Sequence, residues 1–284
     1  MTATLMDGAA LAARIRGEIK QEVAELGEVG LATILVGDDP ASETYIGLKH
    51  KAADEVGIRA VDNRLPAGTS EDEVIELIGG LNEDDSVDGI LVQTPLPPQI
   101  DEARVMRTID PMKDVDGLHP FNAGQLFFGR QTLVGATPVG IMRLLDEYRI
   151  PVAGARAVVV GRSVIVGRPV AMLLLHANAT VTICHSRTGD LARQTLDADI
   201  LVAAVGHVGL ITADMVKQGT AVIDVGINRT EAGLFGDVDA GVAEVAAFLT
   251  PVPGGVGPMT IACLLENALR AARYRRGALA FPRI

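Results

Sequence analysis

The fold is decided by the segment ARAVVVGRSVIVGRPVAMLLLH, residues 155–176. Its Val-rich beginning predicts a buried strand, Gly161 predicts a tight turn, and the apolar stretch after Gly167 predicts a helix. Strand, glycine turn and helix together form the arrangement that binds the pyrophosphate of a dinucleotide at a helix N-terminus. The glycines do not follow the G-x-G-x-x-G spacing, so an ordinary strand-to-helix turn remains the alternative for this segment taken alone.

Short Val- and Ile-rich runs alternate with helical patterns on both sides of this segment. The other runs are residues 31–37, 58–65, 88–97, 179–186, 198–206 and 220–226. Helical periodicity covers 42–57 and 70–81, and Ser70 with Glu73 predicts a capping box at the start of the second helix. This alternation is typical of parallel sheets covered by helices on both faces. The predicted fold class is therefore α/β, with two α/β units one after the other.

The boundary between the units is expected in the Pro- and Gly-punctuated stretch DPMKDVDGLHPFNAG, residues 110–124, or just beyond it. Thr137 and Pro138 are predicted to be the N-cap and first residue of a helix. The segment from Pro258 to Arg276 is predicted to be a helix that packs back on the first domain. We therefore expect one domain at 1–120 with 258–284, and a Rossmann-like domain at 121–257.

The composition excludes several classes of function. The chain has 284 residues and a formal net charge of −11, and such a field repels nucleic-acid phosphates and anionic membrane surfaces. Cys184 and Cys263 lie far apart in the sequence, which favours a reducing compartment over a disulfide framework or a zinc site. Asp7, Arg14 and Arg16 interrupt the apolar core that a secretion signal needs. We expect a cytoplasmic protein without a nucleic-acid or membrane partner.

The end of the strand at 179–186 indicates which dinucleotide binds. An NAD-preferring site usually offers a carboxylate there to the ribose 2′-hydroxyl, whereas this chain has His185, Ser186 and Arg187. With Arg162 in the preceding glycine turn, these residues favour the 2′-phosphate of NADP. The alternative is that the two arginines are solvated loop charges.

Candidate catalytic residues lie in the first half of the chain. Tyr45 and Lys49 are four residues apart in a helical pattern, so both project from one face of the helix. Gln93 falls at the carboxyl end of a predicted strand, the edge where open α/β sheets place ligands. Taken alone, a helical Y-x-x-x-K is more often a solvated surface pair.

Two loops complete the set of candidates. In KDVDGLHP, residues 113–120, Asp114 and Asp116 have no further ligands at a useful spacing, so we expect no metal site, and a turn with a solvated charge remains the alternative. His119 is expected to be a satisfied loop residue. TPVPGGVGPMT, residues 250–260, combines stiff prolines with glycines that let backbone approach a ligand, or else merely connects two domains.

The order and spacing of these motifs resemble one known family from end to end. The matching segments are Y-x-x-x-K at 45–49, VQTPLP at 92–97, KDVDGLHP, GRSVIVGRP, TVTICHSRT, DVGIN and PVPGGVGPMT. They are similar to the bifunctional methylenetetrahydrofolate dehydrogenase/methenyltetrahydrofolate cyclohydrolase family. The resemblance implies two α/β domains flanking a cleft, with a folate-binding catalytic domain, an NADP-binding domain and a homodimer. It also implies oxidation of 5,10-methylenetetrahydrofolate with NADP, then hydrolysis of the methenyl form to 10-formyltetrahydrofolate, in one-carbon metabolism.

The resemblance implies a role for each matching residue. Lys49 would be the central acid/base group, Gln93 would hydrogen-bond it, Tyr45 would stack on the aminobenzoyl ring, and Asp116 would bind the pterin. The implied cofactor residues are Gly161, Arg162, Ser163, Ser186, Arg187 and Ile227. Further implied substrate residues are Val92, Pro253, Gly254, Gly255 and Val256.

Two departures from the family pattern are visible: Gly135 and Ala136 stand where the family reads Pro-Cys, and Thr94 stands where Leu usually follows the glutamine. Neither removes a proposed acid, base or stacking group. The chain has no G-x-x-x-x-G-K-[ST] segment for an ATP-dependent formate ligase. A short-chain dehydrogenase is a rival, but its glycine turn precedes its Y-x-x-x-K. A non-catalytic nucleotide-binding relative is a second rival, which intact Lys49, Gln93 and Asp116 argue against.

Overall fold

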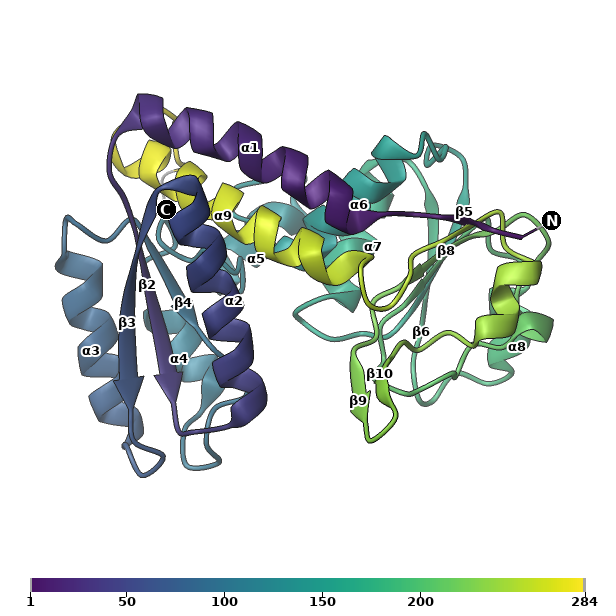
Figure 1. Ribbon diagram of the computed structural model, residues 1–284, viewed down its shortest axis with the longest axis horizontal. Coiled ribbons are helices and arrows are strands. Elements are labelled where there is room, and N and C mark those ends of the chain that lie inside the picture. Colours follow the sequence, from purple (N-terminus) through teal and green to yellow (C-terminus); the bar gives the residue numbers. More distant parts are fainter. Residues whose placement is uncertain (1, 283–284) are drawn as a thin grey trace. The chain divides into compact units, whose positions relative to one another are not determined.

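The computed structural model describes residues 2–282, which divide into two compact units (Figure 1). One unit contains a three-stranded sheet and comprises Arg14–Ala136 with the chain from Ile261 onward. The other contains a six-stranded sheet and comprises the chain up to Ala13 with Thr137–Thr260. This division differs from the expected one in that residues 121–136 join the three-stranded unit, whereas the N-terminal segment up to Ala13 and residues 258–260 join the six-stranded unit.

The three-stranded unit is a parallel sheet with helices on both faces. Its strands are β2 (Val29–Val36), β3 (Ile58–Leu65) and β4 (Gly89–Val92), in the order β3-β2-β4. Its helices are α2 (Pro40–Val56), α3 (Glu71–Glu83), α4 (Glu102–Thr108) and α5 (Pro120–Phe127). Helices α1 (Gly8–Leu26) and α9 (Val256–Arg275) contain residues of both units.

Alternate residues of β2 explain how the two faces are covered. Ala32 and Ile34 pack into the core formed with α3 and α4. Thr33 points to the opposite face, where Nε2 of His50 on α2 lies 2.8 Å from its Oγ1. Since successive side chains of a strand point to opposite faces, the apolar runs of these strands are buried on both sides.

The six-stranded unit is also parallel throughout, in the order β1-β11-β8-β7-β5-β6. Its strands are β1 (Thr4–Leu5), β5 (Arg156–Val160), β6 (Thr180–Cys184), β7 (Ile200–Ala203), β8 (Ala221–Asp224) and β11 (Phe248–Leu249). Its helices are α6 (Ala136–Glu147), α7 (Gly167–His176), α8 (Leu191–Thr195), η1 (Ala213–Met215) and η2 (Ala240–Glu244). A separate antiparallel ribbon joins β9 (Asn228–Thr230) to β10 (Gly233–Phe235).

Of two helix starts predicted from the sequence, the structure confirms one and contradicts the other. The capping box is confirmed, because Ser70 Oγ accepts from Glu73 N at 3.3 Å and Glu73 accepts from Ser70 N at 2.8 Å. The prediction for Thr137 is wrong, because α6 already begins at Ala136. The Thr137 hydroxyl instead pairs with the Thr260 hydroxyl at 2.8 Å, within the six-stranded unit.

Strand order reverses at β2, the central strand of the three-stranded sheet, and at β5, the second strand from one edge of the six-stranded sheet. β2 pairs with β3 on one side and with β4 on the other, and β5 likewise pairs with β6 and β7. In open α/β sheets, ligands bind beyond the carboxyl ends of the strands at such a reversal. The fold therefore offers two candidate positions, one in each unit.

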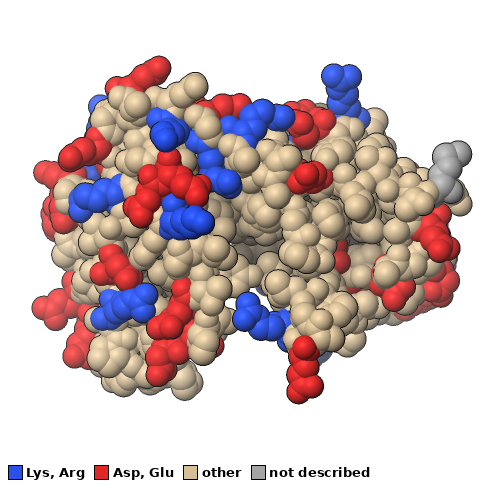
Figure 2. Space-filling model, in the orientation of Figure 1, with Lys and Arg blue, Asp and Glu red and all other residues tan. Residues whose placement is uncertain are grey.

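Charged side chains of both signs share the surface. Figure 2 shows Lys and Arg side chains interspersed with Asp and Glu on the face in view. Among the helices of residues 2–282, none combines the length and apolar character that crossing a bilayer requires.

Candidate functional site

Gln93 lies at the strand-order reversal of the three-stranded sheet, directly after β4. Its backbone N–H donates to the Ile34 carbonyl at 2.9 Å, which holds it beside β2. The side-chain Oε1 accepts from Lys49 Nζ at 3.0 Å, while Nε2 donates to the Thr94 carbonyl at 2.8 Å. The carbonyl bond fixes the amide so that its oxygen faces the lysine. Thr94 contributes only its backbone here, so replacement of the family's Leu leaves this bond intact.

Helix α2 carries Tyr45 and Lys49 one turn apart. The helix begins after Asp39, whose carboxylate accepts from Ser42 N at 2.8 Å. It ends at Val56, and the C-cap residue Gly57 adopts a left-handed conformation. Both side chains are half-buried. The i, i+4 spacing places them on the same side of α2, the side from which Lys49 reaches Gln93.

Asp116 reaches the same edge through a segment that runs alongside β4. Ile90 N donates to the Lys113 carbonyl at 2.7 Å, and Ile90 forms a parallel bridge with Asp114. Two residues further on, Asp116 is level with Val92, the residue before Gln93. The structure thus brings Asp116 close enough to Lys49 for their charges to interact.

Burial and charge act in opposite directions on this pair. Burial lowers the pKa of Lys49, and the Asp116 carboxylate partly restores it. Burial raises the pKa of Asp116 to about 6, against the lowering effect of the Lys49 charge. The lysine is therefore held closer to neutrality than an exposed one, with an acceptor amide in contact.

Asp114 is a structural residue rather than a solvated charge. It is buried, and its carboxylate accepts from the backbone N–H groups of Leu118 at 3.1 Å and His119 at 2.8 Å. Asn122 Nδ2 donates to it at 2.9 Å. His119 is a satisfied loop residue as expected, because its Nδ1 accepts from Phe121 N at 3.0 Å. These bonds shape the loop that carries Asp116.

Two further residues that the sequence did not single out hold the Asp116 loop. Lys113 is buried, and its Nζ donates to the carbonyls of Leu81 at 2.8 Å and Asp84 at 2.9 Å. Asn267 on α9 donates from Nδ2 to the carbonyls of Val115 and Val134, both at 2.8 Å. The only available signal for Lys113 was its place beside the acidic motif, and Asn267 had none.

Val92 differs from the other predicted substrate residues. Its side chain packs in the hydrophobic core and is 2% exposed. Any contact of Val92 with a substrate would therefore go through its backbone.

The predicted dinucleotide residues gather at the carboxyl edge of the six-stranded sheet. Val160 lies opposite Cys184 on β6 and opposite Ala203 on β7, so the chain leaves all three strands at the same level. Gly161 has φ of +126°, and an added Cβ would lie 2.2 Å from the Ala204 carbonyl oxygen. Only glycine allows the turn to sit this close to the loop after β7.

Ser163 organises the start of α7. Its Oγ accepts from Val166 N at 3.1 Å and from Gly167 N at 3.3 Å, because Val166 at the cap position offers no side-chain acceptor. The turn therefore ends in an ordered helix N-terminus, whose positive end favours an anion.

The residues around this turn fit NADP. Arg162, Ser186 and Arg187 are exposed, and Arg187 N donates to His185 Nδ1 at 3.2 Å in the loop after β6. The loop offers cations and a hydroxyl where a carboxylate would repel a 2′-phosphate. Ile227 is 47% exposed beyond β8, on the same edge of the sheet.

The segment 253–256 belongs to the six-stranded unit, together with the dinucleotide residues. It follows β11, and Gly255 N donates to the Pro251 carbonyl at 2.8 Å. Gly254 accepts at its carbonyl from Ala9 N at 3.0 Å. Lys49, Gln93, Asp116 and Tyr45 belong to the three-stranded unit.

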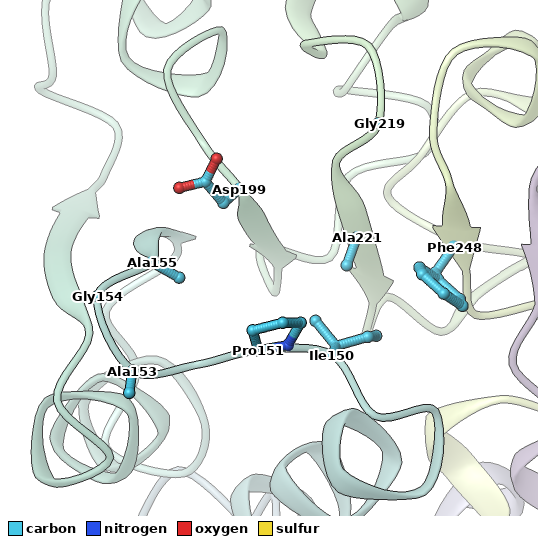
Figure 3. Close-up of a pocket in the computed structure, with 9 residues that line it drawn as sticks. All are labelled: Ile150, Pro151, Ala153, Gly154, Ala155, Asp199, Gly219, Ala221 and Phe248. Carbon is cyan, nitrogen blue, oxygen red and sulfur yellow. The ribbon is translucent and has the colours of Figure 1, made fainter.

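A pocket of about 400 Å³ lies at the other edge of the six-stranded sheet (Figure 3). Its lining residues precede strands or begin them: Ile150, Pro151, Ala153, Gly154, Ala155, Asp199, Gly219, Ala221 and Phe248. It contains none of the candidate residues and is separate from the candidate site.

Two segments of the chain match domains of one family. Residues 6–116 match the catalytic domain described as tetrahydrofolate dehydrogenase/cyclohydrolase. Residues 135–276 match the NAD(P)-binding domain with the same description.

The similarity to two curated proteins extends over nearly the whole chain. A Campylobacter hominis protein described as bifunctional protein FolD is 54% identical over 277 residues, covering 95% of this chain and 98% of that protein. A Burkholderia thailandensis protein of the same description is 54% identical over 284 residues, covering 98% of this chain and 100% of that protein.

Solved structures agree with the sequence comparison. The bifunctional FolD methylenetetrahydrofolate dehydrogenase/cyclohydrolase of Campylobacter jejuni is 48% identical, with a TM-score of 0.94 over 96% of this chain and 99% of that chain. The Trypanosoma brucei methylenetetrahydrofolate dehydrogenase-cyclohydrolase, complexed with NADP and an inhibitor, is 40% identical, with a TM-score of 0.93 over 99% of this chain and 100% of that chain.

Proposed function

Because the chain belongs to the tetrahydrofolate dehydrogenase/cyclohydrolase family, we propose that Lys49, Gln93 and Asp116 form its catalytic cluster. The chain is a bifunctional enzyme that oxidises 5,10-methylenetetrahydrofolate to the 5,10-methenyl form with NADP and hydrolyses that product to 10-formyltetrahydrofolate. The observation that carries the residue assignment is the 3.0 Å hydrogen bond from Lys49 Nζ to Gln93 Oε1, next to the half-buried Asp116.

Folate recognition is assigned to the same edge of the three-stranded sheet. Tyr45 stacks on the aminobenzoyl ring, since a phenol ring one turn from Lys49 offers a flat, half-buried surface. Asp116 accepts hydrogen bonds from the amino and ring N–H groups of the pterin, which fixes its orientation. Val92 contributes its backbone. Pro253, Gly254, Gly255 and Val256, which belong to the six-stranded unit, are assigned to folate binding as well.

The cofactor site is assigned to the carboxyl edge of the six-stranded sheet. Gly161, Arg162 and Ser163 hold the pyrophosphate, and Ser186 with Arg187 binds the 2′-phosphate. Ile227 packs against the cofactor through its exposed side chain. NADP, when bound, accepts the hydride from the bridging methylene carbon.

Lys49 performs the proton transfer of the hydrolytic step. The methenyl substrate is a cation, which together with burial favours the neutral amine. The amine takes a proton from a water that attacks the amidine carbon, while Gln93 Oε1 orients the amine. The bond from that carbon to N5 then breaks as the protonated amine of Lys49 returns its proton to N5, and the hydroxyl proton of the carbinol leaves to solvent, so that the carbon becomes the formyl group on N10.

Replacement of Lys49 by Arg tests the cluster, because a guanidinium stays protonated and accepts no proton from water. Hydrolysis of 5,10-methenyltetrahydrofolate, followed by loss of its absorbance, should slow by on the order of 10²-fold or more. Lys51→Arg is the matched control, since Lys51 is exposed on the same helix. Near-normal hydrolysis by folded Lys49→Arg would remove Lys49 from the central role.

We also propose a cytoplasmic homodimer. β6 is an edge strand that pairs only with β5 among the described strands, so a row of its backbone N–H and C=O groups is open to another strand. Ile183 on this strand is 39% exposed and Leu175 on the neighbouring α7 is 49% exposed. A second copy related by a twofold axis covers both side chains and extends the sheet.

A further inference from the structure

We infer that Asp237 is a positioning residue of the dinucleotide site, acting through the loop that follows β7. The inference rests on the proposed NADP site and adds to it a residue that touches no cofactor in the proposal. Asp237 lies between β10 and η2, far in sequence from the glycine turn, and its side chain is fully buried.

The Asp237 carboxylate binds three consecutive backbone N–H groups of the loop after β7. Oδ2 accepts from Val205 N at 2.7 Å and from Gly206 N at 3.0 Å, and Oδ1 accepts from His207 N at 2.8 Å. Asn228 Nδ2 donates to Oδ1 at 3.0 Å. A single carboxylate therefore fixes the path of this loop and ties it to the start of β9.

A second buried carboxylate fixes Asp237 itself. Asp224, at the end of β8, accepts from Asp237 N at 2.8 Å and from Val238 N at 3.1 Å. Its own N–H donates to Thr250 Oγ1 at 2.7 Å, next to the segment that leads into 253–256. Burial raises the pKa of Asp224 to about 6, against the lowering effect of these backbone donors. A series of hydrogen bonds thus connects the Asp224 carboxylate at the end of β8, through the backbone and side chain of Asp237, to the loop after β7.

The packing around this pair leaves no room for adjustment. A Cβ added to Gly226 would lie 2.3 Å from Asp237 Oδ1, and one added to Gly236 would lie 1.7 Å from Asp224 Oδ2. Gly226 directly precedes Ile227, one of the proposed cofactor residues. The same carboxylate pair thus constrains the approach to Ile227 and the loop after β7.

The loop after β7 borders the glycine turn. The close approach of Gly161 to the Ala204 carbonyl places the turn against the first residue of this loop. Asp237 occupies the inward N–H groups of the loop, and the side chains of Val205 and Val208 remain 39% and 46% exposed. A loop fixed in this way presents an apolar surface at the strand-order reversal, where the proposed site holds the cofactor.

Asp237→Asn keeps the shape of the side chain but turns an amide NH₂ toward backbone N–H groups. One set of donors then loses its acceptor, and the loop after β7 is released. We expect KM for NADP, and the dissociation constant of NADP from calorimetry, to rise by about tenfold or more. Hydrolysis of 5,10-methenyltetrahydrofolate measured without NADP should stay within about twofold of wild type, because the Lys49 cluster lies in the other unit and the Asp237 carboxylate binds residues 205–207 and Asn228 rather than 253–256.

Asp239→Asn is the matched control, since Asp239 is exposed two residues away and only caps η2. An unchanged KM and Kd for NADP in Asp237→Asn, or equal losses of both activities, would overturn the inference. If Asp237→Asn does not fold, Asn228→Ala removes one donor to the same carboxylate and should raise KM for NADP at least twofold, and no rise would overturn the inference. Wild-type protein that reduces no NADP would instead overturn the proposed function.

Discussion

Burial disfavours the ionised carboxylate of Asp116, the form that the proposed contact with the pterin needs. Its pKa is raised by burial to about 6, and the Lys49 charge opposes this shift without cancelling it. Lys49 experiences the reverse effect, since burial lowers its pKa and the Asp116 carboxylate raises it. Each group therefore retains its charge partly because of the other, which couples substrate binding to the protonation of the catalytic amine.

The raised pKa of Asp116 should make stability depend on pH. Between pH 3.8 and about 6, the folded protein binds a proton at Asp116 that the unfolded chain releases, so the contribution of Asp116 to the free energy of unfolding falls as the pH rises. Asp116→Asn removes the effect. The free energy of unfolding of the variant minus that of wild type should therefore rise with pH across this interval, measured by urea denaturation.

For Asp199→Asn we expect the opposite pH dependence of the free energy of unfolding. The hydrogen bond from Lys217 lowers the pKa of Asp199 below 3.8, so its stabilising effect is present above that value and is lost as the pH falls. The difference between this variant and wild type should decrease as the pH rises through the region below 3.8. A flat difference for Asp116→Asn would show that Asp116 titrates normally.

Polar residues show where prediction from the sequence stops. Lys49, Gln93 and Asp116 could be proposed because their motifs occur in a known order. The structural roles of Asp114, Lys113 and Asn267 could not be predicted, because each role depends on partners that only folding brings together. Asn267, for example, holds the carbonyl of Val115, which lies 152 residues away. Nothing local in the sequence distinguishes such a residue from a solvated one.

Among the elements, the strands within Val- and Ile-rich runs were predictable, and the two-residue strands were not. Strands β2, β5 and β8 occupy Val- and Ile-rich runs because both of their faces are buried. β1 and β11 have two residues each, too few to show a periodicity. Their pairing nevertheless draws the N-terminal segment into the six-stranded unit, which explains why the expected domain division differs from the observed one.

The strand–turn–helix element makes a prediction through Gly161. Alanine there would place Cβ 2.2 Å from the Ala204 carbonyl oxygen at a φ of +126°. Gly161→Ala should lower the rate of NADP reduction at least tenfold, through strain at the turn of roughly 1–3 kcal/mol. NADP-independent hydrolysis should be retained, because its cluster lies in the other unit.

Gly189→Ala is the control for this substitution. It lies in the same unit, and a Cβ added there would meet nothing within 4 Å. Equal NADP reduction by Gly161→Ala and Gly189→Ala would mean that the turn is not part of the cofactor site.

If the protein is a homodimer through β6, a charge on this strand should halve the mass of the particle in solution. Ile183→Lys places a charge on the exposed edge strand β6, where a second copy would have to bury it. Light scattering coupled to size exclusion should show a dimer for wild type and a monomer for the variant. Leu196→Lys, at a residue 42% exposed after α8, should remain dimeric. A monomeric wild type would contradict the proposal.

Both activities are assigned to this one chain: the Lys49 cluster binds the folate and hydrolyses its methenyl form, and the six-stranded unit binds the NADP that oxidises the methylene form. Incubation of the purified protein with 5,10-methylenetetrahydrofolate and either NADP or NAD, with reduced cofactor and 10-formyltetrahydrofolate followed together, tests this assignment most directly. The expected result is that both products form and that NADP is reduced faster than NAD. Folded protein that reduces neither cofactor, or that reduces NADP while the methenyl form accumulates one for one, would contradict it.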